Sequence, residues 1–145
     1  MKRLLIIGPL AALAVTGCGS SSTKGASAPA KPTASAAAVQ QVPVDLADFK
    51  IAESKTRLHA GKVTFDVKNT GKVAHEFLVI QTAKPAAKLG HGSRVPEKGN
   101  IGETGNVKPG ASKTLVLKLH KGHYAVICND PGHYMAGMHK DLIVT

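Results

Sequence analysis

Aromatic and acidic residues are both scarce in this chain of 145 residues. It has no Trp, its aromatics amount to 3% of the sequence, and 9 acidic residues face 19 basic ones, for a formal net charge of +10. A basic balance is typical of proteins that bind nucleic acid. The lysines are scattered, however, and no aromatic residues are interleaved with them, so we expect no nucleic-acid partner. The charge suits either solubility near an anionic membrane surface or docking to an acidic protein partner, and the sequence leaves both open.

Long apolar runs are also lacking. The longest, Leu4–Gly17, has fourteen residues and contains Pro9, whereas roughly 18 or more apolar residues are needed to span a bilayer as a helix. A polytopic membrane protein is therefore excluded. The chain length allows one domain with a tail and excludes a large multidomain enzyme.

The first residues have the pattern of an export signal, which we predict over residues 1–17. Lys2 and Arg3 give a positive start, and the apolar stretch Leu4–Val15 is followed by small residues. The sequence Val-Thr-Gly-Cys, which ends at Cys18, resembles the lipobox of bacterial lipoproteins. That resemblance implies cleavage before Cys18, lipidation of its thiol, and a protein anchored on the extracytoplasmic side of the cell membrane. An ordinary signal peptide with an incidental Cys is the alternative.

Residues 18–42 are predicted to be a disordered tether. Gly19–Ala38 consists almost entirely of Ser, Ala, Gly, Pro, Thr and Lys. It has no large apolar residue, so it cannot bury a core. We expect this tether to hold the following domain, residues 43–145, away from the membrane.

Residues 43–145 have the pattern of an all-β domain. Val63–Lys68 alternates apolar and polar residues, which is typical of a half-buried strand. Phe77–Ile80 is apolar at both parities, so we predict a strand that is buried on both faces. Ala83–Gly105 is rich in Lys, Gly and Pro and is predicted to be a long loop with room for a short helical turn. The other predicted strands are a weaker one at Val44–Ile51, then Thr114–Leu119, Tyr124–Cys128 and Leu142–Val144. Short strands separated by Gly and Pro turns indicate a β-sandwich or barrel.

The two cysteines raise a question of pairing. If Cys18 is lipidated, Cys128 has no disulfide partner, which is unusual for an exported protein. Ligation of a metal would explain the lone thiol, because a coordinating thiol is held as the thiolate. A buried inert Cys128 and a disulfide between Cys18 and Cys128 are the alternatives.

The residues around Cys128 favour metal ligation. His133 and Met138 follow it in one segment, and thiolate, thioether and imidazole ligands together select copper over harder cations. His75 can supply the second imidazole of a trigonal His₂Cys set. It shares its parity with Phe77 and Val79, as Cys128 does with Tyr124 and Val126, so both side chains are predicted to point into one end of the sandwich.

With these residues in place, residues 43–145 resemble the cupredoxins, the blue copper fold of plastocyanin, azurin and auracyanin. The resemblance rests on Ala74–Phe77, on the Cys-x4-His-x4-Met segment and on its Pro-Gly-His and Ala-Gly-Met pieces. It implies an all-β Greek-key sandwich with one type 1 copper. It also implies the ligands His75, Cys128, His133 and Met138, of which Met138 is weak and axial. Met135 and His139 are near-miss ligands that spacing disfavours.

One residue departs from the family pattern. Many cupredoxins have an Asn after the first His ligand, and its side chain ties the two ligand segments together. Here that residue is Glu76, and we expect Asn129 to supply part of the tie. Because outer hydrogen bonds tune a metal site, the reduction potential of relatives does not carry over.

The resemblance implies an electron carrier and no enzyme, and we expect a monomer. In the family, the edge of the His in the ligand loop lies at the surface within an apolar patch where redox partners dock. The matching residue is His133, and the patch would comprise Pro131, Gly132, Tyr134, Ala136 and Gly137. A tight turn is the alternative explanation of these residues. Copper delivery or storage is the second functional hypothesis, and a Cys128–His133 hydrolase is a weaker third because no orienting group is evident.

Four further histidines are predicted to be solvated or hydrogen-bonded rather than ligands. They lie in turns, loops or strand ends rich in Lys and Gly. Only the one in the long loop, His91, is a candidate for a second surface metal site. The four are His59, His91, His120 and His123.

Overall fold

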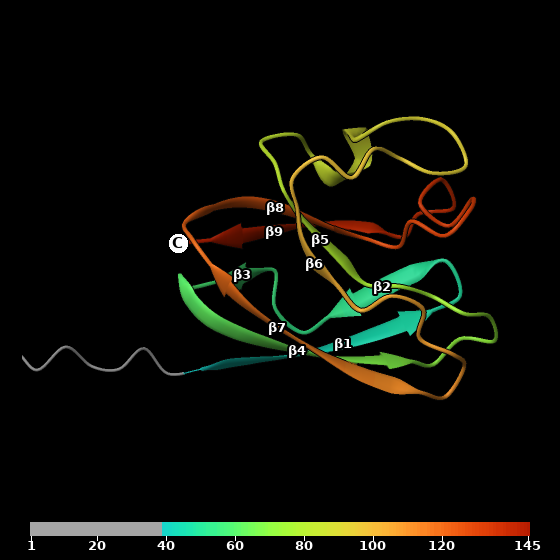
Figure 1. Cartoon of the computed structure of the whole chain (residues 1–145), viewed down its shortest axis with the longest axis horizontal. Coiled ribbons are helices and arrows are strands. Elements are labelled where there is room, and N and C mark those ends of the chain that lie inside the picture. The colour runs from blue at the N-terminus through green and yellow to red at the C-terminus, as the bar shows by residue number, and fades with distance from the viewer. Residues whose placement is uncertain (1–38) are drawn as a thin grey trace, which may run out of the picture. The chain divides into compact units, whose positions relative to one another are not determined.

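A computed structural model describes residues 39–145, which form nine strands and one 3₁₀ turn (Figure 1). The predicted signal peptide, the lipidated Cys18 and most of the predicted tether lie outside the described residues. The first strand begins at Gln40, ahead of the predicted domain start at residue 43. The elements are β1 Gln40–Ala47, β2 Lys50–Glu53, β3 Arg57–Leu58, β4 Gly61–Asn69, β5 Leu78–Gln81, η1 Ala86–Lys88, β6 Asn100–Glu103, β7 Ser112–Leu119, β8 Gly122–Ile127 and β9 His139–Val144.

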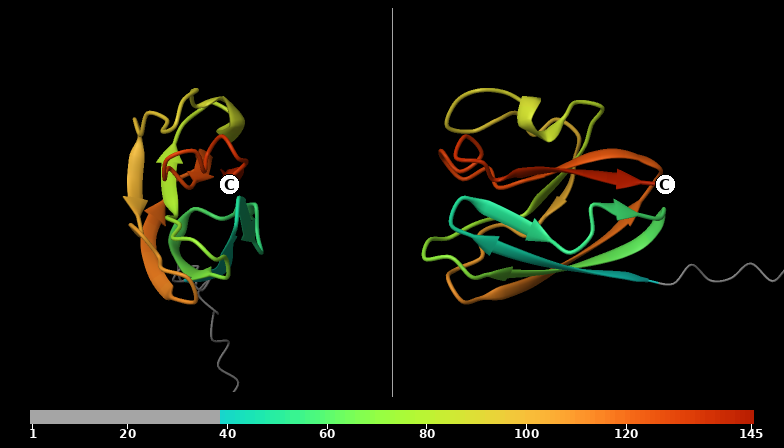
Figure 2. Two further views of the ribbon diagram at one scale, coloured as in Figure 1. Left: turned by 90° about the vertical axis from the view of Figure 1, so that its right-hand side faces the viewer. Right: turned by 180° about the vertical axis from the view of Figure 1, so that it is seen from behind.

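The strands form two sheets packed face to face (Figure 2). One sheet has the order β2-β1-β4-β7 and the other the order β3-β9-β8-β5-β6. The pairs β1–β4 and β3–β9 are parallel and the other pairs are antiparallel. The chain crosses between the sheets after β2, β3, β4, β6 and β7, and the prediction of an all-β Greek-key sandwich is confirmed.

The alternation in the sequence explains how the sheets pack. In β4, Val63, Phe65 and Val67 are buried in the core between the sheets, while the residues between them face outward. Phe65 lies against Phe77 of the opposite sheet, with ring centroids 5.2 Å apart. Tyr124 is also buried, and its hydroxyl donates to the carbonyl of His120 at 2.8 Å and accepts from the N–H of the same residue at 3.1 Å. This tyrosine corner fixes the β7–β8 turn.

The segment around β5 is buried on both faces, as predicted. Phe77 and Val79 face the core between the sheets, whereas Leu78 and Ile80 belong to a second apolar cluster on the outer face. Residues 83–99 cover that cluster, with Ala86 and Val95 buried in it. The long loop is therefore a lid over the second sheet rather than a free connection.

Two parts of the fold differ from the predictions. The predicted loop Ala83–Gly105 contains the edge strand β6, which pairs with β5 across a register shift. Its residues are half-exposed and include Gly102, so they give no alternating pattern. The predicted first strand is a hairpin, because the chain reverses at Asp48–Phe49 between β1 and β2. Phe49 has φ of 60°, a conformation that a bulky residue rarely adopts and that a propensity pattern does not signal.

Asn69, the last residue of β4, organises the turn that leads to β5. Its side chain is fully buried, donates to the carbonyls of Val73 at 2.7 Å and Val107 at 2.8 Å, and accepts from the N–H of Gly71 at 2.8 Å. Buried polar groups require such partners. The amide thus determines the path of residues 70–75, the segment that ends at His75.

We predict that Asn69→Ala destabilises the metal-free protein by about 2–4 kcal/mol, because three hydrogen bonds are lost and two carbonyls lose a partner. Asn106→Ala is the matched control, since Asn106 is exposed, and its effect should stay within about 0.5 kcal/mol. Denaturant unfolding measures both variants. Equal stabilities for the two would contradict the role given to Asn69.

Candidate metal centre

Strand pairing brings the predicted ligand segments together. β5 and β8 are antiparallel neighbours, with Leu78 opposite Ile127. His75 lies just before β5, in an isolated bridge to Val107, and Cys128 directly follows β8. His133 and Met138 lie in the connection from β8 to β9, at the same end of the sandwich as the β1–β2 turn (Figure 1).

The donor atoms of three residues converge on one point. Nδ1 of His75 lies 3.2 Å from Nδ1 of His133, which in turn lies 3.3 Å from Sγ of Cys128. One ligand atom from each residue lies within 4.8 Å of the others. Metal–nitrogen bonds of about 2.0–2.1 Å place two nitrogens at roughly this separation. The predicted convergence of His75 and Cys128 is confirmed, and the residues present fit a single thiolate- and imidazole-bound ion.

Burial sets the protonation of these groups. His75 and Cys128 are both inaccessible to solvent, and His133 is partly exposed. Burial raises the pKa of the Cys128 thiol to about 11, partly offset by the N–H of Glu76, which donates to Sγ at 3.4 Å. Burial also lowers the pKa of His75, against the opposing effect of Asp48. His75 is therefore held neutral, the form that binds metal, and a metal ion must displace the thiol proton.

Glu76 ties the two ligand segments together. Its Oε1 accepts the backbone N–H of Asn129 at 3.0 Å, and its own N–H reaches the Cys128 sulfur. The Asn129 side chain points elsewhere: it exchanges hydrogen bonds with the backbone of Val95 at 2.8 and 3.0 Å and donates to Glu97 at 2.6 Å. Glu76 thus forms the tie between the two ligand segments that was expected in part from Asn129. Asn129 instead anchors the segment of residues 83–99.

Backbone hydrogen bonds close the ligand loop. The N–H of Cys128 donates to the carbonyl of Met138 at 3.0 Å, and the N–H of Met138 donates to the carbonyl of His133 at 3.1 Å. Met138 is fully buried and belongs to the same apolar cluster as Cys128. Gly132 and Gly137 adopt φ of 85° and 113°, which glycine tolerates best. These backbone hydrogen bonds and glycine conformations set the backbone path of the ligand loop.

The surface around His133 corrects one prediction. Pro131, Gly132, Ala136 and Gly137 are exposed, but Tyr134 is 2% exposed and cannot belong to a docking patch. Its ring packs in the outer cluster, and its hydroxyl donates to the carbonyl of Ala86 at 2.6 Å and accepts from the N–H of Leu89 at 3.1 Å. The sequence alone does not indicate whether an aromatic side chain next to a ligand points to the surface or into the core.

Two exposed apolar side chains take the place of Tyr134. Phe49 is 52% exposed and Met135 is 57% exposed, and the Phe49 ring lies edge-on to the His133 ring with centroids 5.7 Å apart. Met135 is predicted above only as a near-miss ligand, and Phe49 lies inside the predicted strand Val44–Ile51. No pattern in the sequence places either residue at this surface.

The remaining candidates lie apart from this centre. Among residues 39–145, the only group of three or more metal-binding side chains is His75, Cys128 and His133, so His91 has no second site around it. His139 packs on Tyr134 with ring centroids 5.0 Å apart. His123 is hydrogen-bonded to the carbonyl of Thr82 at 2.6 Å and to Asp141 at 2.8 Å, as expected for a non-ligand.

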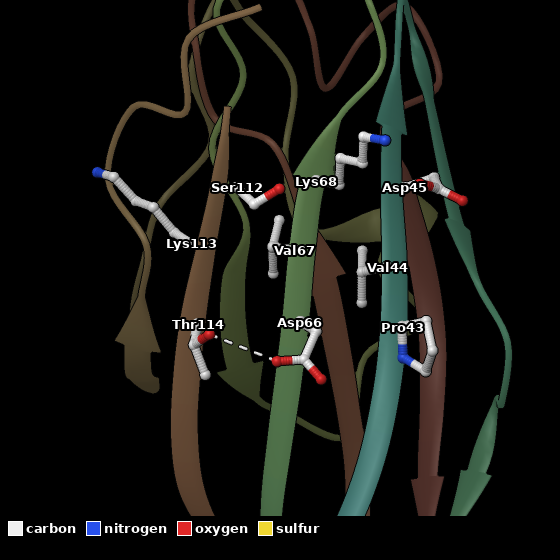
Figure 3. Close-up of a pocket in the computed structure, with 9 residues that line it drawn as sticks. All are labelled: Pro43, Val44, Asp45, Asp66, Val67, Lys68, Ser112, Lys113 and Thr114. Atoms are coloured by element: carbon white, nitrogen blue, oxygen red, sulfur yellow. Dashed lines mark hydrogen bonds between the residues drawn. The ribbon is translucent and has the colours of Figure 1, made fainter. Parts of the chain in front are cut away.

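The described residues also form a surface groove away from the predicted ligands. A groove over β1, β4 and β7 is lined by residues such as Asp66 and Lys68 (Figure 3), and it includes none of the predicted ligands. No helix in residues 39–145 is long and apolar enough to cross a membrane.

We predict that metal affinity rises with pH by about tenfold per unit around neutrality, because one thiol proton with a pKa of about 11 must leave. His75 adds no proton of its own there, since its pKa is lowered by burial. Competition against a chelator of known protonation, at several pH values, measures the slope. Cys128→Ser should lose this slope, and a pH-independent affinity of the unaltered protein would contradict the assignment.

Comparisons with known proteins agree with this geometry. A family model described as a cupredoxin-like domain matches residues 10–144. A relative from Vibrio cholerae, named copper-resistant cuproprotein CopI, is 38% identical over 87 residues, which cover 55% of this chain and 48% of that protein. A Pseudomonas aeruginosa protein of the same name is 28% identical over 146 residues, with 79% and 81% covered. The match thus spans about half the length of the Vibrio protein.

A solved structure shares the fold. Dithionite-reduced auracyanin from Roseiflexus castenholzii superposes with a TM-score of 0.57 and 21% identity, over 74% of this chain and 98% of auracyanin. His75, Cys128, His133 and Met138 form a site of the type 1 copper kind, and copper is the cofactor that the fold and the donor set share. The chain belongs to the family of cupredoxin-like domain proteins.

Proposed function

We propose that this copper protein carries single electrons between redox partners and is not an enzyme. The observation that supports this function is the arrangement of the four ligands: three are fully buried, and only His133 reaches the surface. Bound copper would supply the Cu(I)/Cu(II) couple. The chain would supply a fixed set of ligands and one route for the electron, along the exposed edge of His133.

The site favours a carrier over a hydrolase. A Cys–His pair can act as a nucleophile when the thiol is easily ionised and accessible. Here Cys128 is inaccessible, and burial raises its pKa to about 11. Those properties suit a metal ligand, whose proton the ion displaces, and disfavour attack on a substrate.

The proposed docking surface lies around His133 and consists of Phe49, Pro131, Gly132, Met135, Ala136 and Gly137. All six are exposed, and exposed apolar patches often mark interaction sites. Small, weak interfaces suit fast electron exchange. Without residues 1–17, which contain Lys2 and Arg3, 17 basic residues face 9 acidic ones, and this charge of +8 favours acidic redox partners. We expect the free protein to be a monomer.

We also propose that the protein is exported and lipid-anchored. The support is the sequence pattern of Lys2–Cys18, with its positive start, apolar stretch and lipobox-like end. The domain would then exchange electrons on the extracytoplasmic side, at a distance from the membrane that the predicted tether, residues 18–42, allows.

Copper handling is the second candidate, and a specific observation favours it. Both curated relatives are named copper-resistant cuproproteins. A protein that binds copper for resistance would take it up and release it, whereas an electron carrier would retain it. The burial of His75, Cys128 and Met138 favours retention, so electron transfer stays the first choice.

Two rates separate these functions. We expect electron self-exchange between oxidised and reduced protein, followed by NMR line broadening, to be much faster than transfer of copper to a competing chelator. Chelator transfer within seconds, together with slow self-exchange, would favour copper handling and contradict the carrier. The unaltered mature chain serves both measurements.

We predict that Met135→Gln slows electron self-exchange roughly tenfold, because loss of an apolar contact of about 1.5 kcal/mol weakens the encounter complex. Val116→Gln is the matched control, since Val116 is also a large exposed apolar residue, at 50%, but lies on β7. The visible spectrum should be unchanged in both variants. Equal self-exchange rates in the two variants would remove Met135 from the docking surface.

A further inference from the structure

The two residues of the β1–β2 turn contact both histidines of the copper site. Asp48 Oδ1 lies 3.4 Å from Nε2 of His75, and the ring of Phe49 lies edge-on to that of His133. The turn belongs to the four-stranded sheet, whereas the histidines belong to segments of the other sheet. A contact from consecutive residues to both imidazoles therefore spans the sandwich at its metal-binding end.

Asp48 faces a nitrogen that needs an acceptor. Nδ1 of His75 points toward the donor cluster, so the proton of the neutral ring belongs on Nε2. His75 is inaccessible to solvent, and Asp48 is the only acceptor that the described residues offer to Nε2. A buried ring N–H without a partner is costly. The carboxylate of Asp48 satisfies it and fixes the tautomer that leaves Nδ1 free for the metal.

The surroundings of Asp48 hold it in this place. The N–H of Lys72 donates to the same Oδ1 at 2.8 Å. At Gly71, a Cβ would overlap Asp48 Oδ1 and would lie 3.0 Å from Nε2 of His75. Only glycine leaves the room in which the carboxylate and the imidazole meet.

The backbone of Phe49 is also in a constrained conformation. It is the only non-glycine residue among those described with a positive φ, at 60°. Residues held in such a conformation often occur at functional sites, where the surrounding structure enforces the strain. Here the strained backbone places a half-exposed ring beside His133, the ligand nearest the solvent.

We propose that the Asp48–Phe49 turn positions the copper ligands: Asp48 orients His75 through Nε2, and Phe49 restrains the ring of His133 by packing beside it. Both are positioning residues, because they act through the histidines. The carboxylate also adds a negative charge next to a ligand, which stabilises the more positive Cu(II) state and lowers the reduction potential. The inference rests on the copper site itself and does not require that electron transfer be the function.

Asp48→Asn and Asp48→Ala separate the hydrogen bond from the charge. We expect Asp48→Ala to weaken copper binding by about 10–100-fold and to allow a mixture of His75 tautomers, seen in ¹⁵N–¹H spectra of the metal-free protein. Asp48→Asn, which keeps an acceptor, should retain the tautomer and most of the affinity while its reduction potential rises. The control is Asp45→Ala, which removes an exposed carboxylate from the same hairpin.

The result that overturns the role of Asp48 is an Asp48→Ala protein with the tautomer and affinity of the Asp45→Ala control. The tautomer is read without metal, so the outcome does not depend on electron transfer. If Asp48→Ala does not fold, the comparison of Asp48→Asn with Asp45→Asn still decides: equal potentials would overturn the effect of charge.

Phe49→Gly tests the other half of the turn. Glycine accepts a positive φ, so we expect the metal-free variant to be at least as stable as the unaltered protein. Copper release to a chelator should nevertheless accelerate, by more than in Phe49→Leu, which keeps apolar cover. If Phe49 had a purely structural role, a variant that releases copper faster would also be less stable. An unchanged release rate in Phe49→Gly would overturn the proposed restraint of His133.

Discussion

The antiparallel pairing of β5 with β8 is the constraint on which the copper site depends. It places the residues before β5 beside those after β8, so that His75 and Cys128 emerge at one end of the same sheet. The contact from Glu76 to the Asn129 N–H continues this pairing beyond the strands. Because the remaining two ligands belong to the loop that follows Cys128, one register between two strands aligns the whole donor set.

The site is organised in layers around this pairing. Cys128, His75 and Met138 are buried in the core between the sheets, and the 3.3 Å approach of His133 completes the set from the loop. Outside them, the segment of residues 83–99 covers the second sheet and is tied to the ligand loop by Tyr134 and Asn129. On the opposite side, the β1–β2 turn contacts the two histidines. The strain at Phe49, about 1–3 kcal/mol for such a conformation, is tolerated because both flanking strands are paired.

Sequence reasoning succeeded where one residue type or one periodicity decides the outcome. Alternation in Val63–Lys68 and the double parity of Phe77–Ile80 predicted the two strand types correctly, and the shared parity of His75 and Phe77 predicted the convergence of the ligands. It failed where a side chain's surroundings are distant in sequence. Tyr134 was placed at the surface because nothing local reveals its partners at Ala86 and Leu89. The hairpin at Asp48–Phe49 was missed because a Phe at positive φ contradicts local propensity, and only tertiary contacts enforce it.

The central claim is that Cys128 and the two histidines hold copper as one type 1 site, and a Cu(II) titration of the mature chain followed by visible and EPR spectroscopy tests it most directly. The account predicts an intense thiolate-to-copper absorption band and a small copper hyperfine splitting, both lost in Cys128→Ser. A pale Cu(II) spectrum with ordinary hyperfine splitting, the same in Cys128→Ser, would contradict it and would mean that copper binds elsewhere on the chain.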